Sequence, residues 1–456
     1  MQKINVIVLA AGKGTRMYSA KPKVLHQLAG RSLLQHTLDT AGAINAESIQ
    51  VVIGHEADLI RKSISGQSVN FVLQAEQLGT GHAVHQALPH LNKEAIALVL
   101  YGDVPLIRAE TLAQLLTPVD GNSMAVLTAM VGNPKGLGRI IRDGAGHIRA
   151  IIEEKDATPA QRDIREINTG IMAIPVARLH DWLPRILTSN AQGEYYLTDI
   201  IALAIADSCR VHTVPCQDEL EASGVNNRQQ LAELERHFQK RETTKLMLAG
   251  VMLHDPGRVD LRGNITVAQD VEIDVNVILE GKIDIASNVV IGPNCVLKNC
   301  SIGSGTHIFA NSVIEDAIIG KDCAIGPFAR IRPGTVLEAG AKVGNFVEIK
   351  KSRIGKHSKV SHLSYIGDSE LGTDVNIGAG TITCNYDGVN KFQTIIGDRV
   401  FIGSNTALVA PITVAAGATV GAGSVITQDV GPDQLAIARG KQSNIDGWQR
   451  PKKKPK

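Results

Sequence analysis

Glycines and cations stand together in the segment LAAGKGTRM, which runs from Leu9 to Met17 directly after an apolar stretch. Small residues let backbone N–H groups lie close to phosphate oxygens, and Lys13 and Arg16 would add positive charge. The spacing is not that of a P-loop, and a dinucleotide-binding fingerprint would need a glycine where Met17 stands. The segment therefore predicts either a phosphate site or a plain tight turn.

Two further side chains could take part in chemistry. Asp103 in LYGD follows an apolar run, so its carboxylate would stand at a strand end, where it could bind a metal ion or cap the next turn. His362 in SHLSYIGD is of the residue type that titrates near neutral pH, so it could serve as a general base or play a structural role. It lies two residues beyond the aliphatic Val360, which favours an outward direction.

The elements that would position LAAGKGTRM and LYGD alternate between apolar runs and helix-like segments. INVIVLAA is followed by a predicted helix from Ser32 to Ala43, then by IQVVIG, a second helix toward Ser65, and AIALVLYGDVPL. This alternation is typical of an α/β domain with a mostly parallel, Rossmann-like sheet. Ligands of such folds bind at the C-terminal ends of the strands, which is where both motifs fall.

A different pattern begins after residue 250. The segment 227–250 has Leu231, Leu234 and Phe238 at helical spacing, and it predicts an amphipathic connecting helix. Beyond it, aliphatic residues recur at every sixth position. They are Ile319, Ile325, Ile331, Leu337, Val343 and Ile349, and then Ile396, Ile402, Leu408, Val414, Val420 and Ile426. A sustained period of six predicts a left-handed parallel β-helix with three faces per coil. Glycine follows several of these residues and would suit tight corners. The sequence between Ile377 and Ile396 breaks the period, which predicts an extruded loop.

Composition limits the classes of function. The 456 residues suggest two or three domains, and 47 Lys and Arg against 45 Asp and Glu favour neither nucleic acid nor a membrane surface as a partner. No stretch reaches the roughly 18 apolar residues of a membrane span. The six cysteines show no metal-binding or disulfide spacing, so they are expected to be reduced. The terminal PKKKPK is expected to be a solvated basic tail.

The string LAAGKGTRMYSAKPKVLHQLAG resembles the signature of sugar-nucleotide pyrophosphorylases, and the resemblance continues through QAEQLGTGHA, LYGDVPL, GLGRI, EINTGI, QGEYYLTDI and GVNNR. With a hexapeptide domain that carries HLSYIGD, the chain resembles the bacterial enzymes that join an N-acetylglucosamine-1-phosphate uridylyltransferase to a glucosamine-1-phosphate acetyltransferase. The resemblance covers nearly the whole chain. It implies a nucleotidyltransferase domain over 1–226, a linker helix over 227–250, and an acetyltransferase domain over 251–456 that includes the basic tail.

This resemblance implies two reactions. Glucosamine 1-phosphate is acetylated by acetyl-CoA, and the resulting N-acetylglucosamine 1-phosphate receives a uridylyl group from UTP with release of pyrophosphate. The product, UDP-N-acetylglucosamine, feeds peptidoglycan and lipopolysaccharide precursors. The resemblance also implies Mg²⁺ as cofactor, a homotrimer, a cytoplasmic location, and no nucleic-acid partner or membrane span.

The matching blocks carry over site residues for uridylyl transfer. Those implied to hold uracil and ribose are Leu9, Ala10, Ala11, Gly12, Gln74, Gly79 and Thr80. Those implied to line the sugar and phosphate side are Tyr101, Gly102, Asp103, Gly138, Glu153, Asn168 and Asn226. Asp103 and Asn226 would bind Mg²⁺, and Arg16 and Lys23 would stabilise charge as pyrophosphate leaves.

The carry-over for acetyl transfer makes His362 the general base. Residues implied to bind the amino-sugar phosphate are Arg332, Lys350, Tyr365 and Asn376. Residues implied to contact acetyl-CoA are Ala379, Asn385, Tyr386, Ser404, Ala422 and Arg439. Ser404 is also a candidate to polarise the thioester oxygen or to assist the leaving thiol.

Some choices stay open in the sequence. Asn227, Glu154, Arg330 and Lys351 compete with Asn226, Glu153, Arg332 and Lys350, because each stands within two residues of its rival. Two other functions also remain possible. One is a nucleotidyltransferase whose β-helix only oligomerises or regulates, and the other is a scaffold or binding module without catalysis. The HLSYIGD and NYDG segments favour the bifunctional enzyme.

Overall fold

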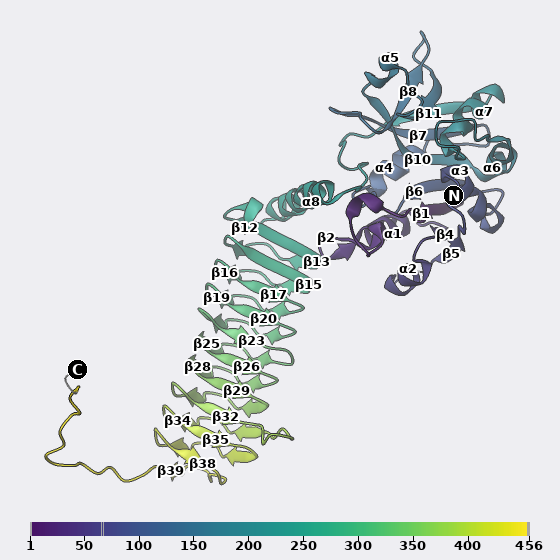
Figure 1. Cartoon of the computed structure of the whole chain (residues 1–456). Coiled ribbons are helices and arrows are strands. Elements are labelled where there is room, and N and C mark those ends of the chain that lie inside the picture. Colours follow the sequence, from purple (N-terminus) through teal and green to yellow (C-terminus); the bar gives the residue numbers. More distant parts are fainter. Residues whose placement is uncertain (1, 65, 67, 454–456) are drawn as a thin grey trace. The chain divides into compact units, whose positions relative to one another are not determined.

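The chain folds into two compact units, Met1–Phe238 and Gln239–Lys456 (Figure 1). The computed structural model describes residues 2–64, 66 and 68–453. The division falls inside α8 (Arg228–Leu248), the helix that follows the GVNNR motif. Ser65, toward which a helix was predicted, and residues 454–456 of the basic tail lie outside the described residues.

A twisted sheet forms the centre of the first unit, with strand order β11-β7-β10-β6-β1-β4-β5. Its strands are β1 (Ile4–Leu9), β4 (Ser48–Ile53), β5 (Asn70–Leu73), β6 (Ile96–Tyr101), β7 (Ser123–Met130), β10 (Glu166–Pro175) and β11 (Arg210–Pro215). β10 runs antiparallel to β6 and β7, whereas the other pairings along this path are parallel. The hairpin of β8 (Gly138–Arg142) and β9 (Ile148–Ile152) joins the sheet through β10. The predicted mostly parallel sheet is confirmed.

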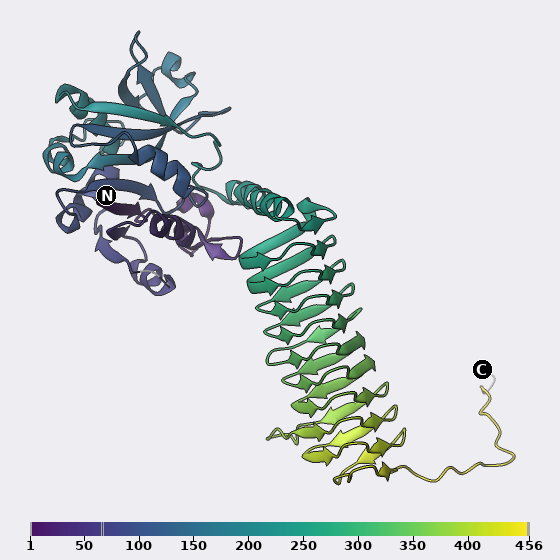
Figure 2. The same ribbon diagram turned by 180° about the vertical axis from the view of Figure 1, so that it is seen from behind.

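Helices cover both faces of this sheet (Figure 2). They are α1 (Leu33–Ala43), α2 (Ala57–Ser63), α3 (Thr80–Ala87), α4 (Ala109–Leu116), α5 (Pro159–Arg162), α6 (Val176–Trp182) and α7 (Ile200–Ala206). Alternate residues of β1 point to opposite faces, so Ile7 packs into one buried cluster and Val8 into the other. A central parallel strand is apolar on both sides for this reason. The Ser32 hydroxyl caps α1 by accepting a hydrogen bond from the Gln35 N–H at 3.1 Å.

The second unit is a column of β coils stacked one on the next (Figures 1 and 2). One sheet contains β12 (Met252–Leu253), β14 (Glu272–Ile273), β16 (Val290–Ile291), β19 (His307–Ile308), β22 (Ala324–Ile325), β25 (Lys342–Asn345), β28 (Lys359–His362), β31 (Asn376–Ile377), β34 (Phe401–Ile402), β37 (Thr419–Val420) and β39 (Leu435–Ala436). Neighbouring strands in it are parallel and belong to successive coils. This is the predicted left-handed parallel β-helix.

The remaining strands of the column form a second continuous sheet that covers its other faces. Its first half contains β13 (Val259–Val267), β15 (Val277–Ile285), β17 (Val296–Lys298), β18 (Ser301–Ile302), β20 (Val313–Glu315), β21 (Ile318–Ile319), β23 (Arg330–Ile331) and β24 (Val336–Leu337). Its second half contains β26 (Glu348–Lys350), β27 (Arg353–Ile354), β29 (Tyr365–Gly367), β30 (Ser369–Leu371), β32 (Ile382–Cys384), β33 (Thr394–Ile396), β35 (Ala407–Val409), β36 (Ile412–Val414) and β38 (Val425–Ile426).

The period of six marks the interior of this column. Each of the twelve aliphatic residues that define it is buried in the single cluster that fills the column. The glycines after them have another reason than the tight corner expected from the sequence. A Cβ on Gly344 would overlap the backbone carbonyl of Ser361 on the next coil. Close stacking therefore requires glycine there, whereas corners with positive φ are often taken by other residues, such as Phe346 and Leu363.

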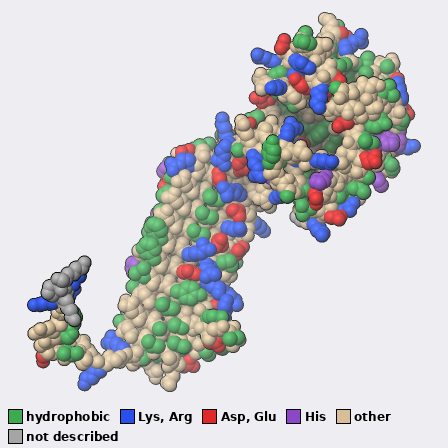
Figure 3. Space-filling model, in the orientation of Figure 1, with side chains coloured by type: hydrophobic (Ala, Val, Ile, Leu, Met, Phe, Trp, Pro, Cys, Tyr) green, Lys and Arg blue, Asp and Glu red, His purple; other side chains and the backbone are tan. Residues whose placement is uncertain are grey.

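The surface of the protein carries acidic and basic side chains mixed together, in the view of Figure 3. This mixture agrees with a formal charge of only +2. None of the helices in the described part of the chain combines the length and the apolar character needed to cross a membrane.

Candidate active sites

The first candidate site lies at the C-terminal ends of β1 and β6, where Leu9 and Tyr101 are paired in register. A pocket of about 240 Å³ opens at this edge of the sheet. The predicted residues that line it are Leu9, Ala10, Ala11, Gly12, Lys23, Gln74, Gly79, Thr80, Tyr101 and Asp103. Gln77 and Glu194 also line it, although sequence reasoning did not single them out. Both lie inside quoted blocks, QAEQLGTGHA and QGEYYLTDI, which was the available signal.

The wall of the pocket around Gln74 is held by local contacts. The Gln74 amide donates to the Gly79 carbonyl at 3.2 Å, and the Thr80 hydroxyl accepts from the Leu197 N–H at 3.1 Å. Gly79 has a φ of 113°, and a Cβ there would lie 2.6 Å from the backbone oxygen of Tyr195. Only glycine fits this close approach, so the segment that enters α3 has a fixed path.

Lys23, Asp103 and Asn226 meet beside this pocket. The Lys23 ammonium forms an ion pair with Asp103 and lies 3.4 Å from Asn226 Oδ1. Arg16 also donates to Asn226 Oδ1, at 2.8 Å. Two cations and two oxygen acceptors thus form one cluster, although Asn226 is some 200 residues from Arg16 and Lys23 in the sequence.

Asn226 and Asn227 have different partners. Asn227 Oδ1 accepts a hydrogen bond from the Gln230 N–H at 2.9 Å, which is the geometry of a cap at the start of α8. Asn226 directs its side-chain oxygen to Arg16 and Lys23 instead. Of the two asparagines, Asn226 is therefore the one that shares the Lys23 ammonium with the Asp103 carboxylate.

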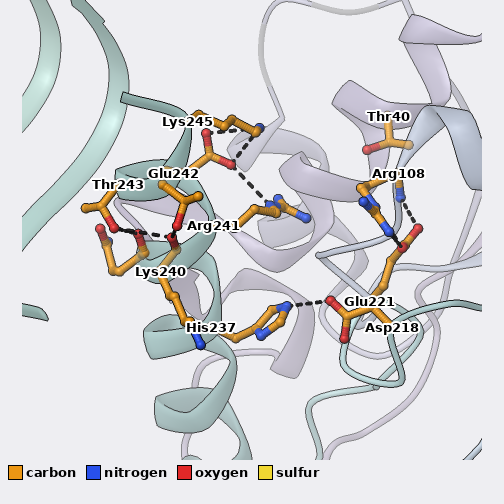
Figure 4. Close-up of polar contacts among 12 residues, drawn as sticks. Thr40, Arg108, Asp218, Glu221, His237, Lys240, Arg241, Glu242, Thr243 and Lys245 are labelled. Carbon is orange, nitrogen blue, oxygen red and sulfur yellow. Dashed lines mark hydrogen bonds and ion pairs between the residues drawn. The ribbon is translucent and has the colours of Figure 1, made fainter. Parts of the chain in front are cut away.

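The loop before Asn226 is held by one ion pair and by one contact between a carboxylate and an imidazole (Figure 4). Glu221 is almost completely buried and accepts from the Arg108 N–H at 2.9 Å and from Arg108 Nε at 2.7 Å. Asp218 pairs with His237 of α8 at 2.8 Å. The Val225 N–H then donates to the Asp103 carbonyl at 2.9 Å. These contacts fix the loop against the segment that follows β6, and so they set the separation of Asp103 and Asn226.

Glu153 and Glu154, the two candidates for the predicted sugar side of the site, have different surroundings. Glu154 is occupied by an ion pair with the buried Arg139 at 2.6 Å. Burial raises the pKa of Glu153, and the Thr198 hydroxyl lies 3.4 Å away as a weak donor. Burial also raises the pKa of Tyr101, with smaller contributions from Glu153 and Asp103. Among the described residues, no cationic side chain lies at hydrogen-bond distance from the Glu153 carboxyl group.

Three other predicted residues, Gly102, Gly138 and Asn168, support this region by different contacts. The Gly102 N–H donates to the Leu9 carbonyl at 3.0 Å. A Cβ on Gly138 would stand 3.3 Å from Glu153 Oε1. Asn168 uses its side-chain oxygen to accept from the Gly170 N–H at 3.0 Å.

The oxygens of Asp103 and Asn226 suit a magnesium ion. Both are of the ligand type that Mg²⁺ prefers, and they already share one cationic group, the Lys23 ammonium. Among the described residues, no group of three or more His, Cys, Asp and Glu side chains gathers as a metal cluster. A pair of protein oxygens matches a Mg²⁺ site that takes its other ligands from water and phosphate.

The second candidate site follows one corner of the β-helix. Backbone hydrogen bonds place His362, Ala379, Ser404 and Ala422 on consecutive coils, because the N–H after each residue donates to the carbonyl of the residue one coil before. Arg439 then donates to the Ala422 carbonyl at 2.8 Å. Predicted acetyl-CoA residues from distant parts of the sequence therefore form one continuous ladder that begins at His362.

His362 stands at the end of β28 and is exposed, as its outward direction predicted. Its Nδ1 lies 2.9 Å from Asn345 Oδ1 on the preceding coil. Sequence reasoning did not identify Asn345. The signal was the distance of 17 residues between the two, which is one coil of the column.

The predicted phosphate cations lie on the neighbouring face. Arg332 pairs with Glu348 at 2.6 Å, and Glu348 is in register with Tyr365. Its rival Arg330 pairs with Glu315. Lys350 and Lys351 both reach Asp368, at 3.9 and 3.6 Å, but their side chains are 21% and 73% exposed. Lys350 is thus the more enclosed of the two. Asn376 follows on β31, between Lys359 and Phe401 in register.

The extruded loop adds a cation that sequence reasoning missed. Tyr386 and Lys391 are bridged across the loop, and the proximity of Lys350 lowers the pKa of Lys391. Asn385 is buried and donates to Asp368 at 2.5 Å, so its side chain points to the same cluster. The loop therefore folds over the face that carries Lys350. The break in the six-residue period indicated the loop but not the direction in which it folds.

Comparison with known proteins agrees with this division of the chain. Residues 6–165 match the MobA-like NTP transferase domain, 261–360 match the GMPPB C-terminal domain, and 393–428 match the hexapeptide repeat of succinyl-transferase. Proteins named bifunctional protein GlmU are similar over 99% of this chain and 100% of their own length. They include those of Marinobacter nauticus at 56% identity, Stutzerimonas stutzeri at 57% and Cellvibrio japonicus at 56%.

Proposed function

This chain belongs to the family of bifunctional GlmU proteins, and from that premise we propose which residues carry each of its two reactions. The chain is an enzyme that makes UDP-N-acetylglucosamine, a precursor of peptidoglycan and lipopolysaccharide. It acetylates glucosamine 1-phosphate with acetyl-CoA and transfers a uridylyl group from UTP to N-acetylglucosamine 1-phosphate. Its location is the cytoplasm, where UTP and acetyl-CoA are both available.

Uridylyl transfer takes place in the pocket of the first unit. A phosphate oxygen of N-acetylglucosamine 1-phosphate attacks the α-phosphorus of UTP, and the bond from that phosphorus to the bridging oxygen of pyrophosphate breaks. The segment from Leu9 to Gly12 would contact the nucleotide together with Gln74, because both line the same pocket. Arg16 and Lys23 bring positive charge to oxygens that would otherwise repel one another. Asn168 and Glu153 face the sugar.

Asp103 and Asn226 would hold Mg²⁺ through their side-chain oxygens. The ion would supply positive charge that offsets the negative charge of the phosphates. Lys23 contacts both Asp103 and Asn226, so its ammonium group would be available to donate to a phosphate bound at this site. The Arg108 and Glu221 pair would anchor the loop that leads to Asn226.

Acetyl transfer takes place along the corner ladder of the second unit. The amine of glucosamine 1-phosphate attacks the thioester carbonyl, His362 removes a proton from the amine, and the carbon–sulfur bond breaks to release CoA as its thiol. Arg332, Lys350 and Lys391 bind the sugar phosphate by charge-assisted hydrogen bonds. Ser404, two coils beyond His362, polarises the thioester oxygen or donates to the leaving sulfur.

The observation that carries this assignment is that ten of the residues predicted for uridylyl transfer line one pocket of the first unit, whereas His362 and four of the residues predicted to contact acetyl-CoA follow one corner of the second unit. The test follows free thiol and pyrophosphate separately. His362→Ala should abolish thiol release and leave pyrophosphate release from N-acetylglucosamine 1-phosphate intact, and Asp103→Ala should do the reverse.

Two surface variants serve as matched controls for this test. His254→Ala changes a histidine of the second unit that pairs with Glu272, and Asp58→Ala changes an aspartate of the first unit that is 85% exposed. Both reactions should continue at the wild-type rate in each. Absence of thiol release from the wild-type chain would favour a β-helix that only oligomerises or regulates, and retention of both activities by Asp103→Ala and His362→Ala would refute the assignment.

A homotrimer is part of the same proposal. Phe328, Phe346 and Leu363 occupy successive coils at one corner, with 49%, 56% and 63% of their surface exposed, and the two phenylalanine rings stack 5.2 Å apart. This apolar corner adjoins His362, so neighbouring copies that cover it would also enclose acetyl-CoA. Light scattering of the purified chain tests the mass. A monomer with full acetylation activity would contradict the proposal.

A further inference from the structure

The backbone around His362 is held from both neighbouring coils. The Leu363 N–H donates to the Asn345 carbonyl at 3.1 Å, and the Gly380 N–H donates to the His362 carbonyl at 3.3 Å. The Ser364 hydroxyl donates to the same His362 carbonyl at 2.7 Å. The exposed imidazole is therefore attached to a backbone that is held in place, and it can move only by rotation about its own side-chain bonds.

One side-chain contact limits that rotation. The imidazole Nδ1 lies 2.9 Å from Asn345 Oδ1, between residues that are partners in the parallel register of β25 and β28. An amide oxygen can only accept a hydrogen bond, so in the neutral ring the proton must be on Nδ1. The lone pair is then on Nε2, which makes no hydrogen bond to any described residue. A general base needs a free lone pair in this position.

We infer that Asn345 is the positioning residue for His362, and that it selects the tautomer with the proton on Nδ1 and directs Nε2 toward the amine of the substrate. The inference rests on the proposed role of His362 as the base. Asn345 would act on the reaction only through the imidazole. An Asn345 amide turned the other way would donate to Nδ1, place the ring proton on Nε2, and block proton removal.

The tautomer can be measured without catalysis. In the full-length protein labelled with ¹⁵N histidine, the His362 signals are assigned by their loss in His362→Ala. We expect the neutral ring of the wild type to carry its proton on Nδ1. In Asn345→Leu, which has a similar volume and no acceptor, the signals should move toward the averaged values of a ring that exchanges between tautomers. A wild-type ring with its proton on Nε2 would overturn the inference.

Kinetics supply the second measurement. Asn345→Leu should lower kcat of acetylation by about 10- to 100-fold, the usual effect of removing a partner that orients a histidine. The KM for glucosamine 1-phosphate should stay within about twofold, because the phosphate cations are untouched. Asn345→Asp keeps an acceptor oxygen and should restore most of kcat. Wild-type kcat in Asn345→Leu would also overturn the inference.

A matched variant separates positioning from folding. Lys342→Leu introduces the same side chain at an exposed position of the same strand, and it should leave the tautomer and kcat unchanged. Uridylyl transfer and thermal unfolding of each variant report on the integrity of the protein. If His362→Ala retains acetylation, the role of the base fails, whereas the tautomer measurement still decides whether Asn345 controls the ring.

Discussion

Glu221→Gln should weaken the response of uridylyl transfer to Mg²⁺ although Glu221 touches no substrate. Its carboxylate is 1% exposed and binds both the backbone N–H and the guanidinium of Arg108. The substitution keeps the shape of the side chain but places an amide NH₂ where one donor of Arg108 needs an acceptor. The loop that ends at Asn226 would lose part of its anchor to the segment after Asp103.

The magnitude follows from the type of contact that is lost. A hydrogen bond to a charged group contributes about 1.5 to 3 kcal/mol. The Arg108 side chain is 43% exposed, so water screens its charge, and we take the lower end, about 1.5 to 2 kcal/mol. If the whole loss appeared as displacement of Asn226, the Mg²⁺ concentration for half-maximal activity would rise by about 10- to 30-fold, which is therefore an upper limit.

The assay is pyrophosphate release at saturating UTP and N-acetylglucosamine 1-phosphate over a range of Mg²⁺ concentrations. Acetylation by the same sample serves as an internal standard, because its proposed residues belong to the second unit. Glu219→Gln is the matched control, since Glu219 is an exposed glutamate of the same loop. An unchanged Mg²⁺ response in Glu221→Gln would refute the reasoning that the ion pair sets the position of Asn226.

Three further predictions address neighbouring residues that the sequence could not separate. Asn226→Ala should abolish uridylyl transfer, whereas Asn227→Ala should remove a helix cap, cost about 1 kcal/mol of stability and leave the Mg²⁺ response unchanged. Glu153→Gln should reduce uridylyl transfer yet raise the unfolding temperature at pH 7. Burial raises the pKa of Glu153 in the folded protein above its value in the unfolded chain. The ionised carboxylate therefore destabilises the folded protein fully at pH values above the folded pKa, and this loss of stability disappears as the pH falls through about 4. Unfolding scans between pH 4 and 8 would show no such trend if the carboxyl is well solvated. Lys350→Met should raise the KM for glucosamine 1-phosphate by about tenfold or more and Lys351→Met by much less, and equal effects in steady-state kinetics would contradict the difference in their exposure.

The adjacent pairs show where sequence reasoning stops. Neighbouring side chains on an extended backbone point to opposite sides. An error of one residue in an assignment therefore replaces a residue that faces the ligand with one that faces the surface. Asn226 faces Arg16 and Lys23 because Asn227 is used as the cap of α8. Which of the two asparagines becomes the cap depends on the residue at which α8 begins, and a helix start can be predicted from sequence only to within a residue or two.

The β-helix was predictable to a greater depth because its repeat is long. Each inward aliphatic residue supports the same register independently. The β-helix has one narrow interior, so few other registers would bury all of these residues. Individual corners were less predictable. The sequence suggested glycine for corners, yet Phe328, Phe346 and Leu363 adopt positive φ values there. Such strain in bulky residues depends on stacking between coils, which no single coil reveals.

The corner ladder also explains why a solenoid suits a long acyl donor. Asn345, His362 and Ala379 are each 17 residues apart, Ser404 follows after 25, and Ala422 after 18. Only the interval of 25 departs from one coil, and the excess is the extruded loop, so the residues remain one rung apart in space. At about 4.8 Å per rung, the line from His362 to Ala422 spans about 14 Å. A straight row of that length presents the proposed base at one end and fixed backbone groups along the rest, which would suit a thioester at the tip of an extended carrier. The extruded loop interrupts the six-residue period but does not disrupt this row, because it exits and re-enters the column within a single coil. Lys391 can therefore approach Lys350 without a change in the geometry around His362.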